Sequence, residues 1–382
     1  MTGNTFERKQ HDVPPYSDRP YPRLLEPARQ SRDAPEVFTT APTFVDAMNT
    51  ATTPSSGISG TTGSLNYLAA SVKSSLYRNS EVLTRRDRDG SDDAFTGVLL
   101  EKLDIPINNA RLLESTQHRT LERHGFELLP RPLGRSDLNF YDHQQVVREY
   151  YGECATVIRE ATGAAHVCAF DHNLRSASGK KKKRRIAGGQ QVQGPARMVH
   201  GDYTLTSAPQ RLQDLTKPAG SNDTLRSILG ADETLLESEM VNQLLQNDDR
   251  FAIINLWRSI AFEPVATHPL ALCDGQTVNP EDLVVFEIHY QDRIGENYFA
   301  KHAPQHTWWY YPAMTRDEAL LIKQWDSAGG LARSGGTRPD SGVDDQKTPC
   351  TFSFHTAFRD PDTTPESPDR QSIEVRCVVV YD

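Results

Sequence analysis

The chain has 382 residues, of which 37% are hydrophobic and 24% are charged, a balance typical of a folded globular protein rather than a disordered one. Its net charge of −9 argues against nucleic acid as the main partner, and no apolar run approaches the about 18 residues that a membrane span requires. The first residues lack the apolar stretch of a secretory signal, and the 5 cysteines form no CxxC pair. Both features favour a reducing, cytoplasmic location.

The N-terminal region differs in composition from the rest of the chain. Residues 1–62 are rich in Pro, Ser, Thr and Gly, which predicts a flexible N-terminal segment. We expect residues 63–382 to form a single domain, with a partly helical first portion at 63–165.

Two helices are predicted. Hydrophobic residues recur at helical spacing over 137–162, where Asp142 is the expected N-cap and Gly163 the expected end. A second helix is predicted over 315–326, because that segment begins with a Thr-x-x-Glu capping box.

The remaining pattern, from residue 166 onwards, is one of short β-branched and aromatic segments. The predicted strands are 166–175, 196–206, 251–260, 282–293, 306–312 and 372–381. Many short strands with few helices predict a mainly β fold with helical additions, either a sandwich or a barrel.

Two links between these strands are predicted to be flexible loops. The link 176–195 contains the basic run KKKKRR, which is interpreted as a solvated loop rather than an anion-binding patch. The link 326–349 is rich in Gly and lies just before His355, which makes it a candidate lid.

The chemistry is suggested by His200-Gly201-Asp202 together with His355, which lies in a late β-like segment. A His-x-acid pair alone is weak evidence, since chance gives one or two in a chain of this composition. Two imidazoles and one carboxylate on one face of a non-haem iron leave its other positions open. We therefore predict His200, Asp202 and His355 as Fe(II) ligands, with 2-oxoglutarate and O2 as co-substrates.

A candidate anchor for 2-oxoglutarate follows the distal histidine. Arg370 and Ser372 share one face of the last predicted strand, where a guanidinium and a hydroxyl suit a distal carboxylate. Arg376 lies on the same face and is the alternative anchor, so the choice between the two arginines stays open.

Several segments together resemble one known family. They are FDHNLR, VHGDYT, RFAIINLWRSI, PLALCD, HTAFRDP, RQSIEVR and the long stretch DRIGENYFAKHAPQHTWWYYPAMTRDEALLIKQWDS. This set is similar to the CmcJ/AsaB-like family of Fe(II)/2-oxoglutarate-dependent oxygenases, which includes a cephalosporin methoxylase component and gibberellin desaturase relatives. The resemblance covers residues 95–382 and implies a double-stranded β-helix (jelly roll). It also implies oxidation of a small molecule in secondary metabolism, with His200, Asp202 and His355 at the matching ligand positions.

The resemblance also suggests residues that line the substrate pocket. The aromatic ones among them are interpreted equally well as buried core residues of strands. Arg258 is the strongest of these, because a charge within an apolar strand needs a partner and a substrate carboxylate is one. In members of the family a short TPH-type sequence usually leads to the distal histidine. Here the sequence that leads to His355 is PCTFSFH instead, which suggests that its two Phe residues form a wall of the substrate site. The substrate-binding candidates are Arg258, Asn255, Trp257, Phe352, Phe354, His172 and Tyr203, and Tyr298, Trp309 and Tyr310 are further pocket-lining candidates.

The predicted function is therefore an Fe(II)/2-oxoglutarate-dependent oxygenase acting on a small molecule, for example an amino acid or a peptide-derived metabolite. Hydroxylation, desaturation and oxidative ring closure are all compatible outcomes, and association into a homo-oligomer is left open. One alternative is a non-catalytic jelly-roll partner subunit that binds a metabolite or another enzyme. Another is a hydrolase or transferase that uses a different metal. The sequence has no GxSxG, GxGxxG or P-loop motif, which disfavours nucleotide-using enzymes.

Overall fold

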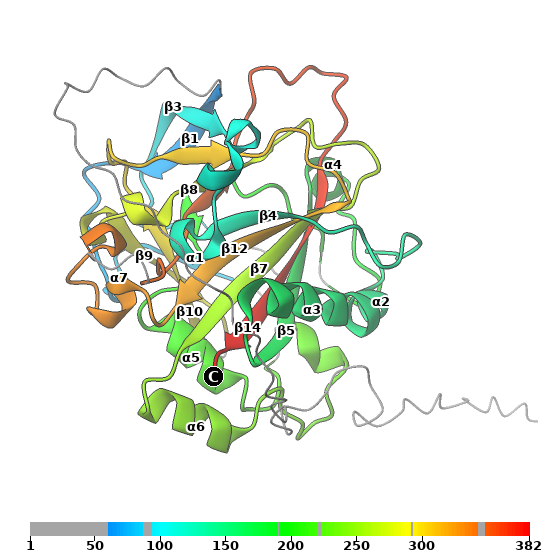
Figure 1. Cartoon of the computed structure of the whole chain (residues 1–382), viewed down its shortest axis with the longest axis vertical. Coiled ribbons are helices and arrows are strands. Elements are labelled where there is room, and N and C mark those ends of the chain that lie inside the picture. Colours follow the sequence, from blue (N-terminus) through cyan, green and yellow to red (C-terminus); the bar gives the residue numbers. More distant parts are fainter. Residues whose placement is uncertain (1–59, 87–93, 190, 221–222, 292, 343–347) are drawn as a thin grey trace, which may run out of the picture.

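The computed structural model describes residues 60–86, 94–189, 191–220, 223–291, 293–342 and 348–382 (Figure 1). All but the last three residues of the predicted N-terminal segment lie outside this part of the chain.

The described residues form two β-sheets. The larger sheet has the order β1 (Thr61–Leu68), β3 (Leu100–Asn109), β11 (Trp308–Tyr310), β8 (Leu270–Cys273), β13 (His355–Ala357), β6 (His200–Gly201), β10 (Ile294–Ala300), β9 (Leu283–His289) and β2 (Leu83–Arg85). The smaller sheet has the order β4 (Phe126–Pro130), β12 (Glu318–Asp326), β7 (Phe251–Ser259), β14 (Gln371–Val380) and β5 (His166–Ser176). The prediction of a mainly β fold is confirmed.

The helices are short and lie between or beside the strands. The α-helices are α1 (Leu121–His124), α2 (His143–Gln145), α3 (Tyr151–Thr162), α4 (Ala177–Lys181), α5 (Ser207–Asp214), α6 (Ser238–Gln246) and α7 (Gly330–Arg333), and a π-helical turn (Val146–Tyr150) joins α2 to α3. The 3-10 turns are Ala110–Leu112, Ser115–Gln117, Thr224–Ser227, Gly275–Thr277, Pro280–Asp282 and Asp340–Gly342.

The smaller sheet is buried on both faces, because α3 packs across β5, β14 and β7 on its outer face (Figure 1). Cys154, Val157 and Ile158 provide buried helix side chains for this contact. Every residue of β7 is buried, so the inner face of the sheet must also be covered. Side-chain contacts of Asp202 with this inner face show that the larger sheet faces it, as described below.

The predicted helix at 137–162 is confirmed, with a later start. The Asp142 carboxylate accepts hydrogen bonds from the backbone of Gln144 and Gln145, so the helical run begins at residue 143. The helix ends at Gly163, which has a left-handed φ of 66°.

The predicted helix at 315–326 is wrong, because most of it is strand β12. The Thr315–Glu318 pair does form, with the Glu318 carboxylate accepting from the Thr315 backbone at 2.9 Å, but it shapes the turn that leads into the strand. All but the first residue of β12 are buried, and a strand buried on both faces loses the alternation that marks strands in sequence. Its charges are hidden by pairing, since Lys323 Nζ lies 2.8 Å from Asp326 Oδ2.

The remaining predicted strands and the two predicted loops agree in part with the structure. Within 196–206 only His200–Gly201 is strand, whereas the remaining predicted strands overlap observed ones. The link 176–195 contains α4, and the link 326–349 contains α7 while residues 343–347 lie outside the described residues. The lid role of the second link stays a prediction.

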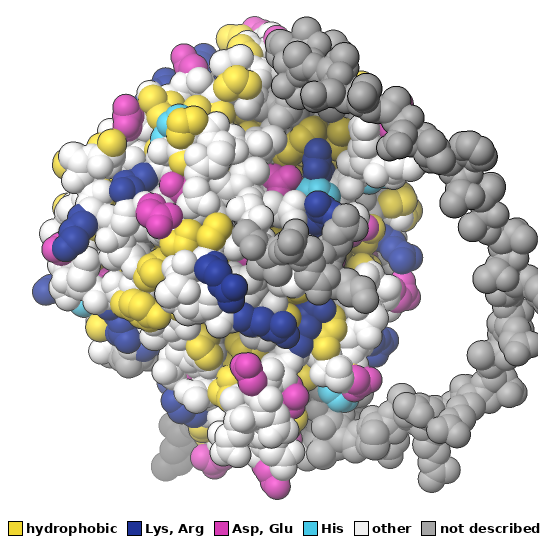
Figure 2. All heavy atoms as spheres, turned by 60° about the vertical axis from the view of Figure 1, so that its left-hand side comes forward, with side chains coloured by type: hydrophobic (Ala, Val, Ile, Leu, Met, Phe, Trp, Pro, Cys, Tyr) yellow, Lys and Arg dark blue, Asp and Glu magenta, His cyan; other side chains and the backbone are white. Residues whose placement is uncertain are grey.

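The five cysteines are all buried and free. In the part of the chain that the structure describes, no helix has the length and apolar character needed to cross a membrane. Basic, acidic and hydrophobic side chains are intermingled on the face shown in Figure 2.

Candidate metal centre

The structure brings the three predicted metal ligands together. His200 on β6 and His355 on β13 are direct partners in the antiparallel register, with ring centroids 4.4 Å apart. Asp202 follows β6 two residues after His200, which turns its side chain towards the same side. One ligand atom from each of the three residues lies within 4.8 Å of the others.

The two imidazoles are held in the form that binds metal ions. Nδ1 of His200 lies 2.8 Å from the carbonyl oxygen of Met198, which leaves Nε2 to face Asp202 Oδ1 at 3.6 Å. Burial, and then the neighbouring His355, lowers the pKa of His200 to about 4. Burial likewise lowers the pKa of His355, so both rings are neutral near pH 7.

Asp202 is held by the smaller sheet. Its Oδ2 accepts from Asn255 Nδ2 on β7 at 3.0 Å and from Arg376 Nε on β14 at 3.1 Å, while its backbone N–H donates to Gln324 Oε1 on β12. Burial acts to raise the pKa of Asp202, but the charges of Arg376, His355 and His200 hold it below its usual value. The carboxylate is therefore ionised, with Oδ1 left facing His200.

Arg376 is fully engaged by protein carboxylates. Besides Asp202, its guanidinium contacts Asp171 at 3.0 Å and Glu374 at 3.2 Å. Arg376 therefore orients an iron ligand and has little capacity left for 2-oxoglutarate.

We expect Arg376→Gln to weaken Fe(II) binding by roughly 10- to 100-fold, the usual effect of losing a group that orients a metal ligand. The substitution also leaves buried carboxylates without their partner, so the melting temperature should fall. Competition with a fluorescent Fe(II) chelator under anaerobic conditions measures the affinity. Unchanged iron affinity in a folded variant would show that the contact with Asp202 does not orient the metal site.

Arg370 is the better candidate anchor for 2-oxoglutarate. It is 2% exposed, its NH1 donates to the carbonyl oxygen of His268, and its guanidinium carbon lies 5.7 Å from the Trp257 ring centroid. No carboxylate forms an ion pair with Arg370 among the described residues. Burial, and then the charge of Arg175, lowers the pKa of Arg370 to about 9. An incoming carboxylate would compensate this buried charge.

Unpaired polar atoms surround Arg370. Arg370 Nε and the hydroxyls of Ser372 and Ser259 are buried without a hydrogen-bond partner in the described part of the chain. Ser372 and Ser259 are direct partners across β14 and β7, so both hydroxyls lie on the inner face of the sheet. Since buried polar groups are nearly always hydrogen-bonded, this cluster fits a bound polar ligand.

The comparisons with known proteins agree with this geometry. The family described as "Oxidoreductase/YMDC permease-like domain" matches residues 65–380. The "Fe(II)/2-oxoglutarate-dependent dioxygenase nvfI" of Aspergillus novofumigatus is 30% identical over 240 residues, which is 62% of this chain and 68% of that protein. An "Uncharacterized protein in dcmA 3'region" of Methylophilus leisingeri is 41% identical over 196 residues, 51% of this chain and 89% of that protein.

The chain belongs to the family of iron- and 2-oxoglutarate-dependent oxygenases. The predicted resemblance to oxygenases of this kind is thereby confirmed. A solved structure of the "iron and alpha-ketoglutarate-dependent endoperoxidase NvfI" has the same fold, with a TM-score of 0.61 and 22% identity over 84% of this chain and 97% of that one.

One predicted substrate residue of this oxygenase, Arg258, faces away from the site. Asn255 and Trp257 point to the inner face of β7, so the alternation of the strand turns Arg258 to the outer face. There its guanidinium donates to the Tyr150 hydroxyl at 2.9 Å and to the carbonyl oxygens of Arg131 and Arg316. The prediction that Arg258 binds substrate is wrong, because helix and loop atoms already pair its charge.

We expect Arg258→Gln to destabilise the oxygenase by about 3 kcal/mol, because it leaves buried acceptors unpaired, while 2-oxoglutarate affinity stays unchanged. Thermal unfolding and a 2-oxoglutarate titration of the same preparation separate the two effects. A variant with normal stability and impaired substrate binding would restore the original interpretation.

His172 also lies on the outer face. It pairs with Val375 in the register, its Nδ1 lies 2.8 Å from the Tyr151 hydroxyl, and it stacks on His143 at 5.4 Å. Its prediction as a substrate-binding residue is wrong, because it is a buried histidine hydrogen-bonded within the core on the outer face of the sheet.

The two phenylalanines before His355 lie on the other side of the larger sheet from the imidazoles. A side chain at Gly201 would meet Phe352 at 3.2 Å and Phe354 at 3.8 Å, and strand alternation turns position 201 away from His200. Phe352 also stacks with Tyr298 at 6.0 Å. These rings therefore pack on the face of β6 that is opposite to the imidazoles, where Gly201 has no side chain to clash with them. The two phenylalanines do not line the metal site, contrary to the prediction.

Four of the remaining candidates lie on the site side, whereas Tyr310, the neighbour of Trp309 on β11, packs against Phe358 on the other side of the larger sheet. Asn255 contacts Asp202, Trp257 lies beneath Arg370, and Trp309 packs in the same buried cluster as Trp257. Tyr203 is partly buried next to Asp202. A substrate-binding role for these residues stays a prediction.

Sequence reasoning missed three residues of this site: Arg175, Ser259 and Gln324. The available signal was in β5, where Asp171, Asn173 and Arg175 alternate with buried residues and so share one polar face. Ser259 and Gln324 lie in apolar segments and are recognised only through the pairing of β7, β12 and β14.

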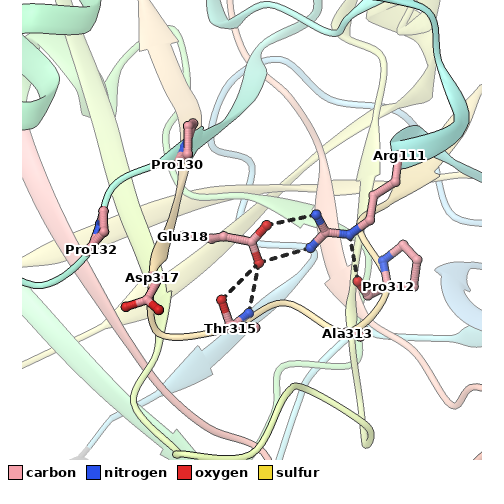
Figure 3. Close-up of a pocket in the computed structure, with 8 residues that line it drawn as sticks. All are labelled: Arg111, Pro130, Pro132, Pro312, Ala313, Thr315, Asp317 and Glu318. Carbon is pink, nitrogen blue, oxygen red and sulfur yellow. Dashed lines mark hydrogen bonds and ion pairs between the residues drawn. The ribbon is translucent and has the colours of Figure 1, made fainter.

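A shallow hollow of about 550 Å³ lies elsewhere, at the start of β12 (Figure 3). Two of its charged residues pair with each other, because Arg111 makes two hydrogen bonds to the Glu318 carboxylate at 2.7 and 3.0 Å. Six residues of extended strand, roughly 20 Å, separate Glu318 from Gln324 at the metal centre. The hollow is therefore not the candidate metal site.

Proposed function

We propose that this oxygenase binds Fe(II) through His200, Asp202 and His355 and oxidises a small organic molecule with 2-oxoglutarate and O2. The observation that carries the proposal is the buried cluster of two neutral imidazoles and one ionised carboxylate between two sheets. This donor set suits non-haem Fe(II) and leaves positions open for a chelating co-substrate and for O2.

We interpret the fold as a double-stranded β-helix within a single domain over residues 63–382. The interpretation is supported by strands that divide between the sheets along the chain, since β5, β7, β12 and β14 belong to the smaller sheet and β6, β8, β11 and β13 to the larger one. Their orders, β5-β14-β7-β12 and β6-β13-β8-β11, are those of a hairpin wound on itself into a two-sheet sandwich.

The protein side chains have distinct tasks in this proposal. Arg370, Ser372 and Ser259 hold the distal carboxylate of 2-oxoglutarate, while Asn255 and Arg376 orient the Asp202 carboxylate. When bound, Fe(II) with 2-oxoglutarate and O2 supplies the oxidising power for attack on a C–H bond. The buried setting excludes water and orients the substrate.

The relatives carry names that include hydroxylase, desaturase and dioxygenase, so hydroxylation and desaturation are both compatible outcomes for this chain. Oxidative ring closure stays a prediction from the sequence. The alternative of a non-catalytic partner subunit is disfavoured, because all three ligand residues are present and converge. We keep a cytoplasmic location as part of the proposal.

Formation of succinate from 2-oxoglutarate tests the proposal. Protein stripped of metal should form no succinate, and Fe(II) should restore turnover in air, whereas Zn(II) should not. Failure of Fe(II)-loaded, folded protein to consume 2-oxoglutarate, with and without a broad set of small organic molecules, would contradict the proposal and favour the partner subunit.

A further inference from the structure

Arg175 is an arginine on the inner face of the smaller sheet, beside the proposed co-substrate site. It is the direct partner of Ser372 in the pairing of β5 with β14, so the two side chains leave the sheet on the same side. The backbone of Gln193 pairs with the outer edge of β5 at this point, but the Arg175 side chain is only partly buried. A molecule arriving from solvent can therefore reach it, whereas Arg370 is 2% exposed.

The positive charge of Arg175 lacks a carboxylate partner among the described residues. Its one hydrogen bond in that part of the chain runs from NH1 to the carbonyl oxygen of Gly194, at 3.0 Å. Glu374 is on the same face, but it forms its ion pair with Arg376, which also takes Asp171 and Asp202. The three arginines of this face therefore differ. Arg376 is ion-paired within the protein, Arg370 is the proposed anchor for 2-oxoglutarate, and Arg175 forms no ion pair among the described residues.

The position of Arg175 also relates it to the metal centre. Gly194, which accepts its hydrogen bond, lies in the segment that leads directly into His200. Arg175, Ser372 and Arg376 lie on one face of the paired strands, and Arg376 contacts the proposed iron ligand Asp202 at 3.0 Å. An anion held by Arg175 would thus lie on the same face of the sheet as the metal centre.

We propose that Arg175 binds a carboxylate or similar oxyanion of the organic substrate, so that the substrate of this oxygenase is an organic acid. This inference rests on the proposed function. A guanidinium presents a planar fork that matches a carboxylate and fixes its orientation, which would hold one C–H bond of the substrate towards the iron. An amino acid or peptide-derived metabolite with a free carboxylate belongs to this class.

The test uses matched acids and amides as probes: 3-phenylpropanoate with 3-phenylpropanamide, decanoate with decanamide, and N-acetylphenylalanine with its amide. Each probe is titrated anaerobically into the full chain loaded with Fe(II) and 2-oxoglutarate, and the visible charge-transfer band of the iron chelate is followed. Succinate formation in air is measured in parallel. We expect at least one acid to shift the band and stimulate succinate formation, while its amide does neither.

Arg175→Gln should weaken the response to the acid by roughly 30-fold or more, because it removes the charged partner of the probe's carboxylate. Arg175→Lys should retain part of the response. The matched control is Arg184→Gln, which removes the same charge from the exposed basic run and should change nothing.

Two kinds of result would overturn the inference. In one, no acid of the set acts differently from its amide on the wild type. In the other, Arg175→Gln raises the 2-oxoglutarate requirement without probe, which would assign Arg175 to the co-substrate. Absence of the band in wild type with iron and 2-oxoglutarate alone would instead contradict the proposed function itself.

Discussion

Replacing His355 by alanine is expected to reduce Fe(II) affinity by more than about 100-fold, because loss of a direct ligand should exceed the 10- to 100-fold effect of losing a supporting residue. His355 Nδ1 is buried without a partner in the described residues, and the ring lies opposite His200. Succinate formation should fall to background, since the open metal positions depend on all three ligands. Iron content after anaerobic reconstitution and desalting measures the binding.

His302→Ala provides the control, because His302 is exposed and lies outside the triad. Its iron content and turnover should match the wild type. If His355→Ala retains one iron per chain and forms succinate at the normal rate, the assignment of the distal ligand is wrong.

Arg370→Gln is expected to weaken 2-oxoglutarate binding by roughly 100-fold, or about 3 kcal/mol, with iron binding intact. The guanidinium is buried beside the unpaired hydroxyls of Ser372 and Ser259, so its loss removes the main attraction for the distal carboxylate. Arg370→Lys should be intermediate, because lysine keeps the charge but lacks the planar fork. The measurement is an anaerobic titration of each iron-loaded variant with 2-oxoglutarate.

Arg359→Gln is the matched control, since Arg359 is exposed and close in sequence. The competing assignment has a clear signature. If Arg370→Gln binds 2-oxoglutarate normally and Arg376→Gln loses it while keeping iron affinity, Arg376 is the anchor.

Much of the fold was predictable, but strand β12 was not. Polar and apolar residues do not alternate along this strand, because both of its faces are buried. In addition, its Thr315–Glu318 pair resembles the capping box at the start of a helix. Burial on both faces is a tertiary property, so local pattern favoured the helix. The helix at 137–162 was predicted because its capping and its apolar stripe act locally.

The metal triad was predictable because spacing and chain order carry it, whereas the surrounding residues depend on strand geometry. Arg258 lies one residue from Trp257, so the period of β7 turns the two side chains to opposite faces. Applying that period to the sequence would have corrected the prediction. The different roles of Arg370 and Arg376 were not predictable. They depend on the tertiary fold, which places Asp171 of β5 and Asp202, just after β6, beside Arg376 on β14.

The most direct test of the account is an anaerobic titration of metal-free wild-type protein with Fe(II) and then 2-oxoglutarate, followed by visible absorption. The account predicts a charge-transfer band that saturates at one equivalent of iron per chain, and that is absent in His355→Ala. Folded wild-type protein that binds iron but never develops the band would contradict the claim that this site chelates 2-oxoglutarate on iron.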